Sequence, residues 1–119
     1  MKKIALVFSS APYGNNKGKD GLNIALSMSC YTNKISIFFI QDGIFQIFNK
    51  QNPKLIFLKK YSNKFNVLPV CNIKNFYLCS TCLSNRGFTE NINFVVQVKY
   101  LNITEIISII NRHDCILNF

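Results

Sequence analysis

Cys79 and Cys82 are the residues whose type and spacing best fit a chemical role. They bound the segment Cys79-Ser80-Thr81-Cys82, which lies where an apolar, strand-like run gives way to a helix-like one. A cysteine at the start of a helix lies near unpaired backbone N–H groups, which favour the thiolate, the form that attacks a sulfane sulfur. Cys79 is therefore the candidate catalytic residue, as a persulfide carrier. The alternative is a small buried apolar residue, as free cysteines often are.

Two other uses of this cysteine pair fit less well. A thioredoxin-like dithiol usually belongs to the first strand–helix unit of its fold, whereas this pair comes late in the chain and has no flanking aromatic residue or proline. Zinc needs further ligands. Cys71 is the only close third thiol, and His113 lies near the far end of the chain. We therefore predict no metal ligands and no cofactor-binding residues.

The remaining cysteines and the histidine favour structural roles. Cys30 and Cys115 lie in apolar surroundings and are predicted to be packing residues, whereas no pattern assigns a role to Cys71. His113 precedes Asp114, but adjacent side chains rarely face one another, so we interpret His113 as a histidine at a helix C-terminus. The odd total of five cysteines, without a secretory signal, indicates a reducing compartment and predicts a cytoplasmic protein.

The glycine-rich segment at residues 14–21 does not match a known phosphate-binding motif. A P-loop has four residues between its two glycines and Ser or Thr after the lysine, whereas three residues separate Gly14 from Gly18 and Asp20 follows Lys19. Gly14 and Gly18 are also too far apart for a dinucleotide fingerprint. We interpret the segment as a loop that leads into the first helix.

The formal net charge of +9 could attract nucleic acid, but the lysines are scattered. The densest region interleaves lysines with aromatic residues, as in single-stranded nucleic acid sites: Lys54, Phe57, Lys59, Lys60, Tyr61, Lys64 and Phe65. Asn, Ile, Lys and Phe are abundant throughout the chain, however, which favours a general compositional bias over a selected surface. A basic RNA-binding module is thus the weaker alternative, and direct contact with nucleic acid is not expected.

Hydrophobic runs and helix signals alternate along the 119 residues. Strands are expected at residues 4–9, 35–40, 75–79, 94–98 and 115–119. The first two are apolar apart from one serine each, as in strands covered on both faces. Such alternation predicts parallel crossovers and a single three-layer α/β/α domain over residues 1–119, with a mostly parallel sheet of about five strands. The apolar run at residues 4–8 is too short for a signal peptide, and no segment is long enough for a membrane span.

The helices have recognisable ends. Asp20 is a plausible N-cap of the first, and short helices are expected at residues 44–48 and 81–86, the latter with Gly87 as C-cap. A further helix is expected near residues 59–68. The clearest helix begins at Asn102, with Glu105 as its capping-box partner. Its expected apolar stripe consists of Ile103, Ile106, Ile107 and Ile110.

Large apolar side chains are concentrated at residues 38–48. Phe38, Phe39, Phe45 and Phe48, with three isoleucines between them, exceed what one small core needs. Clustered aromatic side chains are typical anchors of protein interfaces. We therefore predict that some of them face a partner, unless a sheet covered on both faces absorbs them.

These segments together resemble the TusC/DsrF branch of the DsrE-like sulfur-relay proteins. The resemblance covers essentially the whole chain and depends on the order and spacing of five blocks. They are Ile-Ala-Leu-Val-Phe-Ser-Ser-Ala-Pro-Tyr-Gly at 4–14, Gly-Lys-Asp-Gly-Leu at 18–22, Phe-Phe-Ile-Gln-Asp-Gly-Ile-Phe-Gln at 38–46, Cys79 with Arg86-Gly87-Phe88, and His-Asp-Cys-Ile-Leu-Asn-Phe at 113–119.

The resemblance implies a subunit of a TusBCD-like complex that relays persulfide sulfur toward 2-thiolation of the tRNA wobble uridine. The implied partners are TusB-like and TusD-like subunits in a heterohexamer, a transient TusA-like donor and a TusE-like acceptor. In the TusD-like subunit, the persulfide is carried by a cysteine at the place that Cys79 occupies here. The resemblance implies mainly an assembly role for this chain, as a non-catalytic or accessory subunit. The alternative makes Cys79 itself a persulfide carrier.

Overall fold

Five parallel strands form the single sheet of the computed structural model. The structure describes residues 3–10, 17–30, 34–47, 67–71, 73, 75–87 and 96–119. The strands are β1 (Ile4–Phe8), β2 (Ile35–Phe39), β3 (Asn75–Cys79), β4 (Lys99–Leu101) and β5 (Cys115–Asn118), in the order β4-β3-β2-β1-β5. Every neighbouring pair is parallel. The predicted α/β fold with a five-stranded parallel sheet is confirmed.

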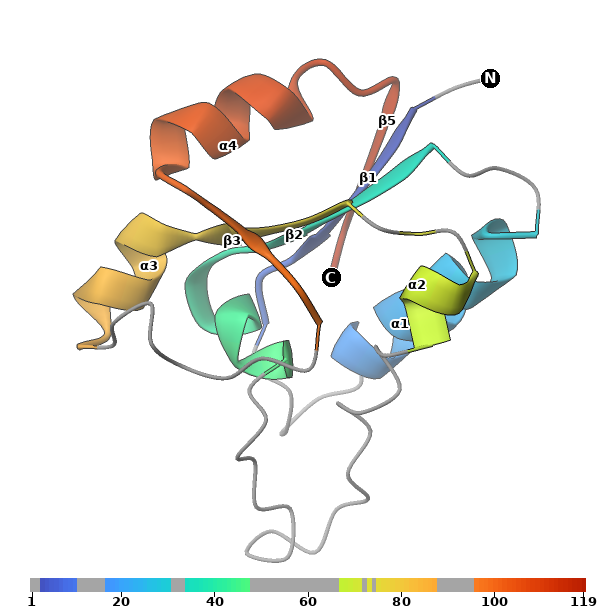
Figure 1. The fold of residues 1–119 in the computed structure, drawn as a ribbon, viewed down its shortest axis with the longest axis horizontal. Coiled ribbons are helices and arrows are strands. Elements are labelled where there is room, and N and C mark those ends of the chain that lie inside the picture. The colour runs from blue at the N-terminus through green and yellow to red at the C-terminus, as the bar shows by residue number, and fades with distance from the viewer. Residues whose placement is uncertain are drawn as a thin grey trace, which may run out of the picture.

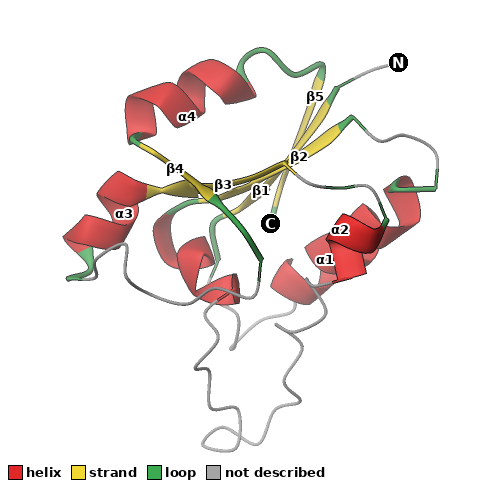
Figure 2. Cartoon of the chain, viewed as in Figure 1, coloured by secondary structure: helices red, strands yellow, loops and turns green. Residues whose placement is uncertain are grey.

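Helices cover both faces of this sheet (Figures 1 and 2). Helix α4 (Ile103–Ile110) lies on one face, and helices α1 (Lys17–Met28) and α2 (Val67–Val70) lie on the other. The short helix α3 (Ser80–Asn85) follows directly from the carboxyl end of β3. All five residues of β2, the polar Ser36 included, are buried, as expected for a strand between two layers.

Phe8 is the point at which several elements of the core meet. Its ring lies 5.5 Å from that of Phe39 and 5.6 Å from that of Phe119, measured between ring centroids. Helix α1 approaches it at Gly21, where an added Cβ would lie 2.5 Å from the Phe8 ring. The absence of a side chain at Gly21 therefore lets α1 pack against β1.

The 3-10 helix η1 (Gln41–Ile47) packs against the end of β1 through a second glycine. A Cβ on Gly43 would overlap the carbonyl group of Phe8, so only glycine fits there. Ile44 and Ile47 of η1 are fully buried. The short helix expected at residues 44–48 is thus present in this region, but it starts at Gln41 and is wound more tightly than an α-helix.

Two boundary predictions were wrong and a third was confirmed. Helix α1 begins at Lys17, so Asp20 lies in its first turn and is not the N-cap. Helix α3 ends at Asn85, and Gly87, just beyond Arg86, has the left-handed φ of 81° that the predicted glycine cap requires. The predicted strand at 94–98 is instead β4 at Lys99–Leu101, which pairs with Tyr77–Cys79.

Pairing explains the shift of β4. A three-residue strand opposite the last three residues of β3 leads directly into α4, whereas Val96 lies before the strand and is buried without ladder hydrogen bonds of its own. The apolar character of Val96 thus reflects the core and not a strand. Phe94 lies outside the described residues, as do the helix region at 59–66 and the lysine/aromatic segment at 54–65.

Helix α4 begins where the sequence predicted, but the side that it turns toward the core differs from the predicted one. The side chain of Asn102 accepts a hydrogen bond of 2.9 Å from the backbone N–H of Glu105. Ile106 is fully buried, and Ile109 and Ile110 pack against the core. Ile103 and Ile107 are exposed, so the predicted stripe was wrong for these two residues.

The aromatic block is mostly internal. Phe38 and Phe39 are fully buried and Phe45 is half-buried, whereas Phe48 lies outside the described residues. For Phe38 and Phe39, the alternative that a two-sided sheet absorbs them is therefore correct. Their backbone belongs to the central strand β2, which leaves their side chains no access to a partner.

Candidate functional site

Cys79 lies at the junction of β3 and α3, as the sequence predicted. It is the last residue of β3 and the N-cap of α3, with extended backbone angles. Its sulfur accepts a hydrogen bond from the backbone N–H of Cys82, with an N···S distance of 3.3 Å. Cys79 therefore occupies the position that an oxygen-bearing Ser, Thr, Asp or Asn side chain usually takes at a helix start.

Burial opposes the thiolate form of this cysteine. The side chain is 0% exposed and belongs to the main hydrophobic cluster. Removal of the sulfur from water raises the pKa of the Cys79 thiol above its ordinary value, and the lowering effect of the backbone N–H of Cys82 is smaller. The residue at the helix start is thus a neutral thiol at neutral pH.

Cys82 and Arg86 complete the immediate surroundings of Cys79. Cys82 is buried one turn further along α3, and its carbonyl oxygen accepts a hydrogen bond of 3.1 Å from Nη1 of Arg86. Nε of Arg86 donates to Oδ1 of Asp42 at 3.0 Å, which joins α3 to η1. An exposed ion pair of this kind stabilises by at most about 1 kcal/mol, and its single hydrogen bond is a polar link between the end of α3 and η1. Asp42 and Arg86 are 44 residues apart, so no local spacing pattern predicts this pair.

The other cysteines lie apart from this site. Cys30 is exposed near the end of α1, so the prediction that it packs in the core was wrong. Its sulfur lies 4.0 Å from the carbonyl oxygen of Leu26. Cys71 and Cys115 are half-buried. Within the described part of the chain, no group of three His, Cys, Asp or Glu side chains could hold a metal ion.

His113 is a residue of a helix C-terminus, as predicted. Its Nδ1 lies 2.8 Å from the carbonyl oxygen of Ile109 in the last turn of α4. Asp114 turns away and accepts a hydrogen bond of 2.8 Å from the backbone N–H of Lys3. His113 and Asp114 therefore do not act as a base with its orienting carboxylate.

Comparison with known proteins agrees with this arrangement. The model of the DsrE/DsrF-like family matches residues 2–119. The chain belongs to the DsrE/DsrF-like family. The resemblance to its TusC/DsrF branch is confirmed by curated relatives named Protein TusC from three Buchnera aphidicola subspecies. Those from Baizongia pistaciae, Schizaphis graminum and Acyrthosiphon pisum are 43%, 40% and 38% identical, each over 100% of both chains.

The DsrE/DsrF-like fold extends to more distant proteins. The crystal structure of the ychN protein from E. coli matches with a TM-score of 0.82 at 22% identity and covers 100% of both chains. At this low identity the comparison shows a shared fold and carries no information on function. In the described part of this DsrE/DsrF-like chain, no helix is long and apolar enough to cross a membrane.

Proposed function

We propose that this chain is a subunit of a TusBCD-like sulfur-relay complex that passes persulfide sulfur toward 2-thiolation of the tRNA wobble uridine, and that it acts mainly in assembly. Its full-length likeness to proteins named TusC supports the relay role. The burial of Cys79 is the observation that supports assembly over sulfur transfer.

Persulfide transfer needs an accessible thiolate. The acceptor thiolate attacks the terminal sulfur of the donor persulfide, the donor S–S bond breaks, and the donor cysteine leaves as a thiolate. Cys79 is 0% exposed, and burial raises the pKa of its thiol. Both the approach of a donor persulfide and the loss of the proton are therefore unfavourable in this conformation, so the reactive cysteine belongs to a partner such as the TusD-like subunit.

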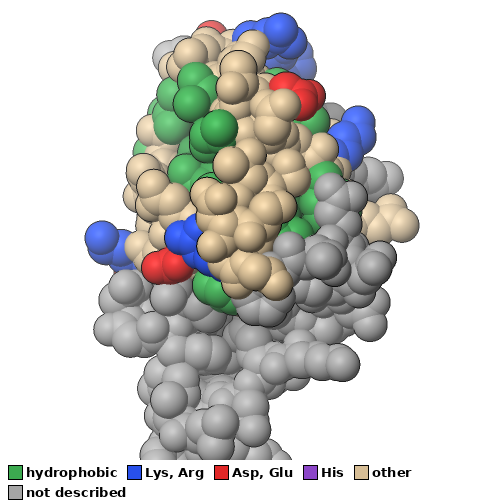
Figure 3. Space-filling model, turned by 90° about the vertical axis from the view of Figure 1, so that its left-hand side faces the viewer, with side chains coloured by type: hydrophobic (Ala, Val, Ile, Leu, Met, Phe, Trp, Pro, Cys, Tyr) green, Lys and Arg blue, Asp and Glu red, His purple; other side chains and the backbone are tan. Residues whose placement is uncertain are grey.

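An apolar strip on α4 is the surface that we assign to a partner subunit. Ile103 is 36% and Ile107 is 52% exposed, and residues four apart lie on the same side of a helix. Figure 3 views the side where α3 and α4 lie and shows hydrophobic side chains gathered in its upper part. In this proposal the strip contacts a TusB-like or TusD-like subunit in a heterohexamer, in place of the buried aromatic block. The TusA-like donor and TusE-like acceptor bind the assembled complex transiently.

The assembly role predicts opposite outcomes for two substitutions. Ile107→Lys places a charge on the apolar strip and should weaken co-purification with TusB-like and TusD-like subunits about tenfold, because loss of a central apolar contact costs about 1–2 kcal/mol. Ser108→Lys adds the same charge at an exposed neighbour of the strip and serves as the matched control. Equal retention of partners by both variants would contradict the assignment of this surface.

Cys79→Ser separates assembly from sulfur transfer. Serine is a good N-cap, so α3 should persist, while the sulfur nucleophile is lost. Cellular 2-thiouridine, measured by mass spectrometry of tRNA digests, should stay within about twofold of wild type, a change worth less than about 0.5 kcal/mol. Loss of thiolation by a folded, partner-bound Cys79→Ser variant would refute the assembly role.

The alternative function, a persulfide carrier, has one observation in its favour. The backbone N–H of Cys82 lies 3.3 Å from the Cys79 sulfur and would stabilise an anion there once the site opened. Incubation with a persulfide-loaded donor, followed by intact-mass measurement, distinguishes the two functions. A gain of one sulfur atom that disappears in Cys79→Ser would support the carrier.

A further inference from the structure

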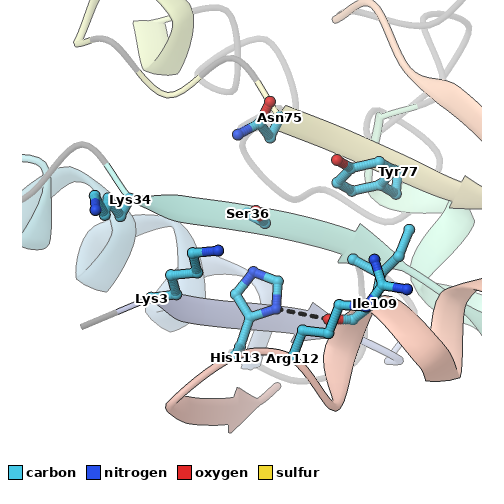
Figure 4. A pocket seen from close by; sticks show the side chains of 8 residues that line it. All are labelled: Lys3, Lys34, Ser36, Asn75, Tyr77, Ile109, Arg112 and His113. Atoms are coloured by element: carbon cyan, nitrogen blue, oxygen red, sulfur yellow. Dashed lines mark hydrogen bonds between the residues drawn. The ribbon is translucent and has the colours of Figure 1, made fainter. Parts of the chain in front are cut away.

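A basic pocket lies on the α4 face of the sheet, at the end opposite Cys79. Its volume is about 400 Å³, within the range of small-molecule sites. Lys3 and Lys34 immediately precede β1 and β2, and Asn75 is the first residue of β3, so the pocket lies at the amino ends of these strands. Ile109 in the last turn of α4, with Arg112 and His113 just beyond the helix, lines its other side (Figure 4).

Positive charge dominates this pocket. Three cationic side chains from separate segments, just before β1, just before β2 and just after α4, line it: Lys3, Lys34 and Arg112. As far as the described residues are concerned, no carboxylate side chain is among the residues that line it. The pocket therefore gathers charges that the sequence shows only as scattered residues, far apart along the chain.

Neutral hydrogen-bonding groups form the floor. Ser36 lies opposite Asn75 in the β2–β3 register, and Phe38 lies opposite Tyr77, so the four side chains share one face of the sheet. Of these, Ser36, Asn75 and Tyr77 line the pocket and carry hydroxyl and amide donors. The Tyr77 ring stacks on buried Phe38 with a centroid distance of 5.0 Å, which holds it in place.

His113 is fixed in orientation at the edge of the pocket. A carbonyl oxygen only accepts hydrogen bonds, so Nδ1, 2.8 Å from the Ile109 oxygen, carries a hydrogen. The ring also meets Phe38 edge-on, with centroids 5.7 Å apart. The contact with Ile109 thus involves Nδ1, and Nε2 is the ring nitrogen that a ligand in the pocket could contact.

Two features oppose an anion here, and both are weaker than the cations. The C-terminus of α4 carries about half a negative charge, against the full positive charges of Lys3 and Arg112. Asp114 lies beside His113, but its Oδ2 accepts the backbone N–H of Lys3 and does not line the pocket. The net field in the pocket is therefore positive.

We propose that this pocket binds the phosphate group of a small phosphorylated molecule. A phosphate monoester carries a charge of about −1.5 to −2 at neutral pH and three acceptor oxygens, which match several cations and neutral donors better than a carboxylate does. The pocket is larger than one phosphate group, and Ile109 and the Tyr77 ring offer apolar surface to the organic part. This inference is independent of the proposed relay role.

The single histidine of the chain provides the measurement. His113 is the only histidine in the sequence, so the imidazole Cε1–H signal in the NMR spectrum of the full chain comes from this residue. Titration with ribose 5-phosphate or inorganic phosphate at constant ionic strength should shift this signal to saturation at millimolar or lower concentrations. Ribose and chloride should leave it in place. No saturable shift with ribose 5-phosphate, or equal shifts with chloride, would overturn the proposal.

Charge variants test the geometry of the site. Arg112→Gln should weaken ribose 5-phosphate binding about tenfold or more, because a charged hydrogen bond is lost at an exposed residue that the fold does not need. Asp114→Asn keeps an acceptor for the Lys3 N–H and should tighten binding by about two- to fivefold. Lys19→Gln is the matched control: it also removes one positive charge, but from α1 on the other face of the sheet, and should leave the affinity for ribose 5-phosphate unchanged. Equal weakening by Lys19→Gln and Arg112→Gln would reduce the binding to general attraction by net charge and overturn the proposal.

Discussion

A thiol at the start of a helix experiences two opposing effects, and Cys79 shows how they combine in this protein. The N–H of Cys82 favours the anion, while desolvation by the surrounding core favours the neutral thiol. Desolvation is the larger effect, so the pKa of Cys79 is raised. The position of Cys79 in the sequence suggests a nucleophile, but in the structure its thiol acts as a helix cap.

The raised pKa of Cys79 predicts a pH dependence of stability. Because the folded protein retains this proton where the unfolded chain releases it, the stabilisation is present below the ordinary pKa of 9.0 and is lost as the pH rises through the folded value. The free energy of unfolding, measured by urea denaturation between pH 8 and 10, should fall more steeply in wild type than in Cys79→Ser. Cys30→Ser, which changes a thiol outside the core, is the matched control. Parallel pH profiles for wild type and Cys79→Ser would contradict the burial of this thiol.

At the scale of elements, the sequence predicts where a helix starts better than which side it buries. The cap at Asn102 depends on one side chain and an N–H three residues later, a local relation that the sequence contains in full. The buried side of α4 depends on how the helix lies across β3 and β4. Ile106, Ile109 and Ile110 therefore pack inward, while Ile103 and Ile107 stay exposed although they are equally apolar.

The cap on α4 gives a prediction at this scale. Asn102→Ala removes the acceptor for the Glu105 N–H and should lower the free energy of unfolding by about 1 kcal/mol. Ser108→Ala, at an exposed position within the same helix, should change it by less than about 0.5 kcal/mol. Both values come from urea denaturation followed by circular dichroism. Equal stability of the two variants would show that the cap contributes nothing.

In the whole molecule, β1 is the strand on which several separate segments of the chain pack together. It pairs with β2 on one side and β5 on the other, and Phe8 at its end contacts rings from both neighbouring segments. Gly21 and Gly43 let α1 and η1 approach this same residue closely. Segments from the start, the middle and the end of the chain therefore share one packing centre.

Phe8→Ala should consequently be among the most destabilising single substitutions. Loss of a fully buried phenylalanine costs about 3–5 kcal/mol, because a cavity remains between elements that cannot all move inward. Phe8→Leu retains much of the volume and should cost less than about 1.5 kcal/mol. Thermal unfolding of the two variants measures the difference. Similar melting temperatures would contradict the convergence of elements on this ring.

Local and periodic features of this protein follow directly from its amino-acid order. Apolar runs set β1, β2 and β3, the Asn102 cap set the start of α4, and the order of motifs indicated the family, because each of these depends on neighbours along the chain. Four other features come from the packing of the folded chain: the start of β4, the environment of Cys79, the exposed side of α4 and the basic pocket. Each of these features depends on segments that are distant in sequence. The burial of a side chain and the charge around it are set by all the segments that lie near it in space.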